Sequence, residues 1–147
     1  MESLNYLTTN RPDIAYAVNI LSQFMAKSSE SHWNATNKVL RYLKGTMIFG
    51  LLYTDKFDVQ LVGFSDSGWA RNIDDRRSTS SFAFNIGSRV MSWSSKKQPT
   101  VSLSSIEAEY KAMSSATCEV VWLRRIIEYV GEKQEEPTKV HCDNQCS

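Results

Sequence analysis

The first third of the chain carries apolar residues at helical spacing. Ile14 and Val18 lie four positions apart, and they follow Pro12, a residue that suits the first position of a helix. The pattern predicts a helix that begins near residue 12. Asn10 or Thr9 is expected to cap it, because both side chains can accept hydrogen bonds from the first helical amides.

Beyond this helix the apolar pattern changes its period along the chain. A second helix is predicted from about Ser31 to Gly45, because glycine commonly ends a helix. After it, apolar residues occur in short runs or alternate with polar ones, which is typical of extended structure. Extended segments are predicted at residues 47–53, 59–66, 82–86 and 90–94, the last two being joined by a tight turn at residues 87–88.

The longest helical pattern follows these extended segments. It is predicted to begin at Ser105 as N-cap and to end at Gly131, with a break near residues 117–119. A last strand is predicted at 139–143. Three consecutive strands, a helical crossover and a fourth strand predict a mixed α/β sheet in which the fourth strand is parallel to the first. Small residues on one side of the helix are Ala108, Ala112 and Ala116.

Composition narrows the function classes without selecting one. The chain has 147 residues, 41% hydrophobic and 22% charged, which is ordinary for a globular domain. No apolar run is long enough to cross a bilayer, and no signal-peptide pattern is visible, so no membrane partner is expected. The net charge of +1 means that nucleic-acid binding would need a local basic patch. The odd number of cysteines, three, predicts free thiols rather than a disulfide framework. A zinc site is not expected, because no second closely spaced pair of ligands is present.

Carboxylates stand at the ends of the two strands that are predicted to be parallel neighbours. Asp66 closes the first strand and Asp143 closes the fourth, so both should emerge at one end of the sheet. Glu107 and Glu109 lie early in the intervening helix and could add a third carboxylate. Such a cluster requires a counter-charge, and carboxylates with water suit magnesium. Each acid taken alone is an ordinary turn or helix-start residue; only their combination predicts a site.

Several ordered motifs then resemble a known family. Residues 11–18 and 40–46 resemble the end of the reverse transcriptase in the Pol polyproteins of copia-type LTR retrotransposons. Later segments resemble the ribonuclease H domain that follows it. These later segments are residues 63–70 (GFSDSGWA), 75–80 (DRRSTS), 92–98 (SWSSKKQ), 104–110 (SSIEAEY) and 141–145 (HCDNQ).

The resemblance implies an RNase H-like fold with three antiparallel strands, a helical crossover and a parallel fourth strand, preceded by an α-helical segment. Residues 1–54 would be a helical C-terminal remnant of the reverse transcriptase (thumb or connection), and 55–147 a truncated ribonuclease H-like domain. The implied reaction is hydrolysis of the RNA strand of an RNA–DNA hybrid with two Mg²⁺ ions, Mn²⁺ being the alternative. Asp66, Glu109 and Asp143 match the family's catalytic and metal-binding acids, with Glu107 as the alternative helix residue.

One departure from the family pattern leaves an alternative function open. The family carries a fourth acidic residue after a fifth strand and further helices, and residue 147 precedes that point. The fold is therefore expected to be incomplete at its C-terminus. The alternative function is a catalytically inactive retroelement fragment that binds nucleic acid or a protein partner. Cleavage of a labelled hybrid discriminates the two.

A hybrid-binding role also predicts phosphate contacts and a stacking ring close to the acids. Basic residues with nearby aromatics suit backbone contact, and small hydroxyls can bond to the ribose 2′-OH. The other implied partner is the remainder of the Pol polyprotein, and the expected location is intracellular, in a cytoplasmic particle or the nucleus. The predicted nucleic-acid contacts are Ser65, Ser67, Arg76, Arg77, Trp93, Lys96 and Lys97.

Overall fold

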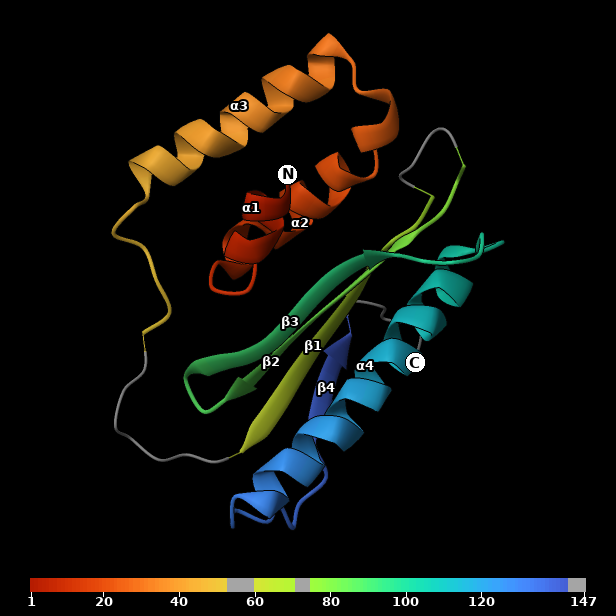
Figure 1. Ribbon diagram of the computed structural model, residues 1–147. Helices are drawn as coiled ribbons and strands as arrows, with labels where there is room; N and C mark the ends of the chain where they lie inside the picture. The colour runs from red at the N-terminus through yellow and green to blue at the C-terminus, as the bar shows by residue number, and fades with distance from the viewer. Residues whose placement is uncertain (53–59, 71–74, 143–147) are drawn as a thin grey trace. The chain divides into compact units, whose positions relative to one another are not determined.

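The structure, a computed structural model, describes residues 1–52, 60–70 and 75–142 (Figure 1). The chain divides into two units, Met1–Leu52 and Tyr53–Ser147. The first is helical and the second holds the sheet. The assignment of the first unit to the end of a reverse transcriptase stays a prediction.

Three α-helices and a short 3₁₀ helix make up the first unit. Both predicted helices are confirmed. Leu4, Ile14 and Val18 form its small buried core, against which Val39 and Leu43 pack. The elements are α1 (Glu2–Leu7), α2 (Pro12–Ser22), η1 (Met25–Lys27) and α3 (Glu30–Gly45).

The start of α2 differs from the expected cap. Arg11 is the N-cap residue and no side chain caps the helix, so the predicted caps at Thr9 and Asn10 are wrong. The Arg11 guanidinium instead donates to Asp13 at 2.7 and 2.9 Å and to Thr46 beyond the end of α3. The same guanidinium holds the pKa of Asp13 below its ordinary value. An arginine bridge therefore ties the start of α2 to the end of α3.

The extended segment predicted at 47–53 is also wrong. Residues 47–52 form no strand, and residue 53 lies outside the described residues. Met47 and Ile48 are 79% and 94% exposed. An apolar run becomes a strand only where a neighbouring strand receives its hydrogen bonds, and local β-propensity alone does not supply one.

The second unit contains a four-stranded mixed sheet in the order β3-β2-β1-β4. β1 is antiparallel to β2, β2 is antiparallel to β3, and β1 is parallel to β4. This confirms the predicted RNase H-like arrangement, including the parallel fourth strand. The strands are β1 (Leu61–Gly68), β2 (Thr79–Ile86), β3 (Arg89–Lys97) and β4 (Lys139–Cys142).

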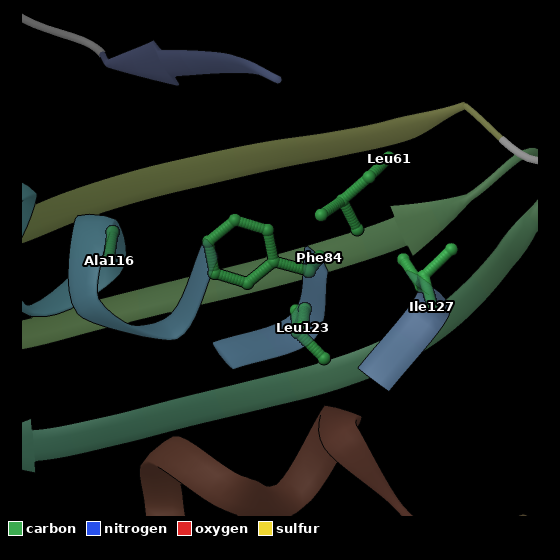
Figure 2. Packing of buried hydrophobic residues seen from close by; sticks show 5 residues of the cluster. All are labelled: Leu61, Phe84, Ala116, Leu123 and Ile127. Atoms are coloured by element: carbon green, nitrogen blue, oxygen red, sulfur yellow. The ribbon is translucent and has the colours of Figure 1, made fainter. Parts of the chain in front are cut away.

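The crossover helix α4 (Ser105–Tyr129) covers one face of the sheet (Figure 1). Side chains from β1, β2 and α4 point toward one another between helix and sheet (Figure 2). Their packing removes apolar surface from water and fixes the helix on the sheet. The buried cluster consists of Leu61, Phe84, Ala116, Leu123 and Ile127.

The helix α4 is continuous, so the break predicted near 117–119 is wrong. Ala116 is fully buried, and the hydroxyl of Thr117 donates to the Met113 carbonyl at 2.9 Å within the helix. The Thr117 hydroxyl thus forms its hydrogen bond within the helix and does not interrupt it. The N-cap is Ser104 rather than Ser105, and its hydroxyl accepts the amide of Glu107 at 3.1 Å.

Gly63 on β1 leaves room for the Phe84 ring of β2 to pack against its backbone. A Cβ at this position would lie 2.3 Å from Cε1 of Phe84. We therefore expect Gly63→Ala to lower the free energy of unfolding by about 1–3 kcal/mol, the usual cost of overpacking. Denaturant titration followed by circular dichroism measures it. In a chain that already carries Phe84→Leu, the added methyl should cost less; an equal cost in both backgrounds would contradict the proposed clash.

Candidate active site

The parallel pair β1 and β4 brings two chain segments to one end of the sheet. Val62 lies opposite Lys139, and Ser65 lies opposite Cys142. Asp66 is therefore the residue on β1 that follows the last described pair between β1 and β4. It does not close the strand as predicted, because β1 continues to Gly68. Asp143 follows Cys142 in the sequence and lies outside the described residues.

The pleat of β1 determines which face each of its side chains occupies. Leu61 and Ser65 are buried on the α4 face, and Ser65 is 7% exposed. Phe64 and Asp66 alternate with them and are exposed on the opposite face. Phe64 stacks there on His141 of β4, with ring centroids 5.3 Å apart. Asp66 is thus an exposed carboxylate beside an aromatic pair.

Glu109 lies in the second turn of α4, above the same end of the sheet. Its Oε2 is buried and has no hydrogen-bond partner among the described residues. The negative charge of Glu109, added to the larger effect of burial, raises the pKa of the Cys142 thiol. The Cys142 sulfur also lies 3.4 Å from the sulfur of Met113, one turn further along α4. Glu109 is therefore close to the carboxyl end of β4.

Glu107 has both of its oxygens occupied. One oxygen forms an ion pair with Lys111 at 2.7 Å, and the other accepts the backbone amide of Leu103 at 2.7 Å. The Lys111 ammonium and then the Leu103 amide hold the pKa of Glu107 below its ordinary value. Both oxygens of Glu107 are thus bonded at the start of α4, whereas Oε2 of Glu109 has no hydrogen-bond partner in the part of the chain that the structure describes.

Asp66 and Glu109 approach this end of the sheet from opposite faces. The described part of β4 ends opposite Ser65, whereas β1 runs three residues further to Gly68. Along those three residues, the β1 edge has no paired strand among the described residues on its β4 side.

The residue types at this edge fit a hard divalent cation. Carboxylate oxygens are the ligands that magnesium prefers, and a cation would satisfy the buried Oε2 of Glu109. The described residues contain no group of three histidine, cysteine or acidic side chains able to hold a metal. Asp143, the third acid that the sequence predicts, is outside the described part, so the full ligand set stays a prediction.

The basic residues predicted to contact phosphates differ in whether they already form an ion pair with a carboxylate of this chain. Lys97 forms an ion pair with Asp75 at 2.6 Å, and Arg77 lies 3.6 Å from the same carboxylate. The Lys97 ammonium holds the pKa of Asp75 below its ordinary value. Arg76 and Lys96 are exposed. Lys97 and Arg77 would have to leave Asp75, or share it, in order to bind a phosphate.

Trp93 and the two serines lie on different faces of the sheet. Trp93 pairs with Ala83, which pairs with Phe64, so the half-buried indole is on the Asp66 face. Ser65 and Ser67 are on the α4 face, and the hydroxyl of Ser67 is buried without a hydrogen-bond partner among the described residues. This burial does not favour direct contact of either serine with a ribose.

Sequence reasoning assigned no role to Gln98, which the structure buries beside the candidate site. Its side chain is 3% exposed and donates to the Ser80 hydroxyl and the Ala108 carbonyl, both at 2.8 Å. It also accepts the Ser102 hydroxyl at 2.8 Å. The only sequence signal was its place in the motif at 92–98, since a glutamine after two lysines resembles an exposed loop residue.

The chain has relatives among known proteins that are recognised from sequence. No protein-family model matches the chain, and no solved structure matches it. Secreted RxLR effector protein 161 of Plasmopara viticola is 49% identical over 117 residues, which cover 80% of this chain and 82% of that protein.

None of the described helices is both long and apolar enough to span a bilayer.

Matches over almost the whole chain come from transposon polyproteins. The retrovirus-related Pol polyprotein from transposon RE2 of Arabidopsis thaliana is 41% identical over 142 residues, 97% of this chain. The corresponding polyprotein from transposon TNT 1-94 of Nicotiana tabacum is 39% identical over 144 residues, also 97% of this chain. The chain spans only 10% and 11% of their respective lengths. With the motifs in order and the RNase H-like sheet present, the chain belongs to the Pol polyproteins of copia-type retrotransposons.

Proposed function

We propose that this chain is the ribonuclease H part of a retrotransposon Pol polyprotein and that it hydrolyses the RNA strand of RNA–DNA hybrids. The observation that carries the proposal is the parallel register of β1 and β4, with Ser65 opposite Cys142. Asp66 and Asp143 each follow one member of this pair in the sequence. The Cys142 sulfur lies 3.4 Å from the sulfur of Met113, one turn after Glu109 on α4, which supports a third acid near the same end.

In this proposal Asp66, Glu109 and Asp143 hold divalent cations. Two bound magnesium ions would supply the chemistry of phosphodiester hydrolysis by activating a water and stabilising the leaving oxygen. Asp66 contributes an exposed carboxylate that a solvent-borne substrate can approach. Glu109 contributes an oxygen already withdrawn from water, where its attraction to a cation is less screened. Glu107 remains bonded to Lys111 and Leu103 and serves the helix start.

Substrate binding would use the Asp66 face of the sheet and the neighbouring basic residues. Arg76 and Lys96 are exposed and can meet phosphates directly. Phe64 and His141 form an exposed aromatic pair beside Asp66. Contacts of this kind follow the backbone without reading base sequence, as a hybrid nuclease requires.

Incubation with a hybrid labelled on its RNA strand tests the proposal. We expect cleavage of the RNA strand in magnesium, no cleavage after chelation, and recovery on adding Mg²⁺ or Mn²⁺, because the acids need a cation to act. Single-stranded RNA and duplex DNA of the same sequence are the control substrates. Binding of the hybrid without cleavage would support the alternative, a catalytically inactive retroelement fragment, and would overturn the enzymatic proposal.

A further inference from the structure

The residues around Gln98 connect the two segments that carry the proposed ligands. On one side, the indole of Trp69, three residues after Asp66, donates to the Ser102 carbonyl at 3.2 Å. The Ser102 hydroxyl donates to Gln98 at 2.8 Å. On the other side, Gln98 donates to the carbonyl of Ala108, the residue before Glu109. A continuous chain of hydrogen bonds thus joins the end of β1 to the start of α4.

Burial makes these hydrogen bonds hard to replace. Gln98 and Ser102 are each 3% exposed, and Ala108 is fully buried. Water cannot substitute freely for a lost partner at such a depth, so an unpaired group there is costly. The backbone amide of Gln98 donates to the Ser78 carbonyl at 2.8 Å, which fixes the residue on the sheet. Gln98 is therefore a rigid link between sheet and helix.

Glu109 depends on its backbone for its position. Its Oε2 has no hydrogen-bond partner among the described residues that would orient the carboxylate. The bond from Gln98 to the Ala108 carbonyl instead fixes the rotation of α4 and its height above the sheet at this turn. A metal ligand held by such a support is presented in one geometry rather than several.

We propose that Gln98 is a positioning residue that holds Glu109, through the Ala108 carbonyl, at the distance from β1 that cation binding requires. The inference rests on the proposed function, since it assigns Glu109 to a divalent cation. Gln98 itself touches neither the cation nor the substrate. Its amide fits the role because a single side chain donates to β2 and α4 and accepts from Ser102, in the segment between β3 and α4.

The test uses Gln98→Met, which keeps the length of the side chain and removes its hydrogen bonds. In the full chain, we expect the magnesium concentration for half-maximal binding to rise about tenfold, the lower end of the cost of losing a group that orients a ligand. Calorimetric titration with Mg²⁺ measures it without reference to cleavage. Amide hydrogen exchange should quicken in the first turns of α4 and stay unchanged in its last turns.

Gln134→Met is the matched control. The Gln134 side chain accepts the amide of Leu61 at 3.1 Å, at the opposite end of β1 from the candidate site. Its loss should lower the unfolding temperature without changing the magnesium titration. Equal weakening of magnesium binding in both variants, or an unchanged titration in Gln98→Met, would overturn the positioning role.

The outcomes also separate this inference from the proposed function. If the wild-type chain binds magnesium but does not cleave a hybrid, the enzymatic proposal fails while the titration of Gln98→Met still decides the positioning role. If the wild-type chain cleaves and Gln98→Met titrates like it, only the positioning role fails. If the wild-type chain binds no magnesium, both are wrong.

Discussion

Replacing Asp66 by asparagine should abolish cleavage of an RNA–DNA hybrid while leaving the fold intact. The substitution keeps the size of the side chain and removes its charge. Because the charge stabilisation that a bound metal provides is worth several kcal/mol, we expect the cleavage rate to fall by about 10²–10³-fold or more. Initial rates on a hybrid labelled on its RNA strand, at fixed magnesium, give the effect.

The fold should tolerate this change because Asp66 is exposed and has no role in the buried cluster. The unfolding temperature without metal should stay at the wild-type value. Magnesium should raise the unfolding temperature of the wild-type chain and not that of the variant, since a ligand stabilises only the folded state that binds it. A wild-type cleavage rate in Asp66→Asn would remove Asp66 from the site.

Asp75→Asn is a suitable comparison for Asp66→Asn. Asp75 is also partly exposed, but its carboxylate is paired with Lys97 and Arg77 rather than directed toward the candidate site. Loss of its charge should leave cleavage at saturating hybrid little changed. Because the two cations are released, binding of the hybrid should tighten at low salt and show a steeper dependence on salt concentration.

Most of the sheet could be predicted because its pattern is local. Phe82, Phe84 and Ile86 alternate along β2, and the order of elements requires a parallel fourth strand. Two predictions failed for different reasons. The run at 47–52 has the composition of a strand but no strand to pair with among the described residues. Thr117 stays within α4 because its hydroxyl donates to the Met113 carbonyl one turn earlier.

The candidate site could be predicted only as far as residue identity and order allow. Asp66 and Glu109 could be proposed as site residues because motifs place acids beside predicted strand and helix ends. The face of the sheet on which Asp66 lies could not be assigned, because residues 61–64 are apolar or small at consecutive positions and do not show which side of the strand faces α4. Gln98 was missed because its burial depends on α4 folding back over β2, a contact that no local pattern contains.

The two helix glutamates give the sharpest remaining comparison, since the same substitution should affect them differently. Glu109→Gln should reduce cleavage about as strongly as Asp66→Asn, by about 10²–10³-fold, because it removes the charge that the proposed function assigns to cation binding. Its unfolding temperature without metal should stay level or rise. A buried carboxylate oxygen without a partner is costly, and the neutral amide reduces that cost.

Glu107→Gln should show the reverse pattern. It weakens the ion pair with Lys111 and the bond from the Leu103 amide, so the unfolding temperature should fall slightly while cleavage is retained. Lowering the pH should remove the difference in unfolding temperature between Glu107→Gln and the wild-type chain. The pKa of Glu107 is lowered in the folded chain, so its contribution to stability is present above the unfolded pKa and is lost as pH falls through the folded pKa. Loss of cleavage in Glu107→Gln with cleavage retained in Glu109→Gln would exchange the two roles and remove the basis for the link through Gln98.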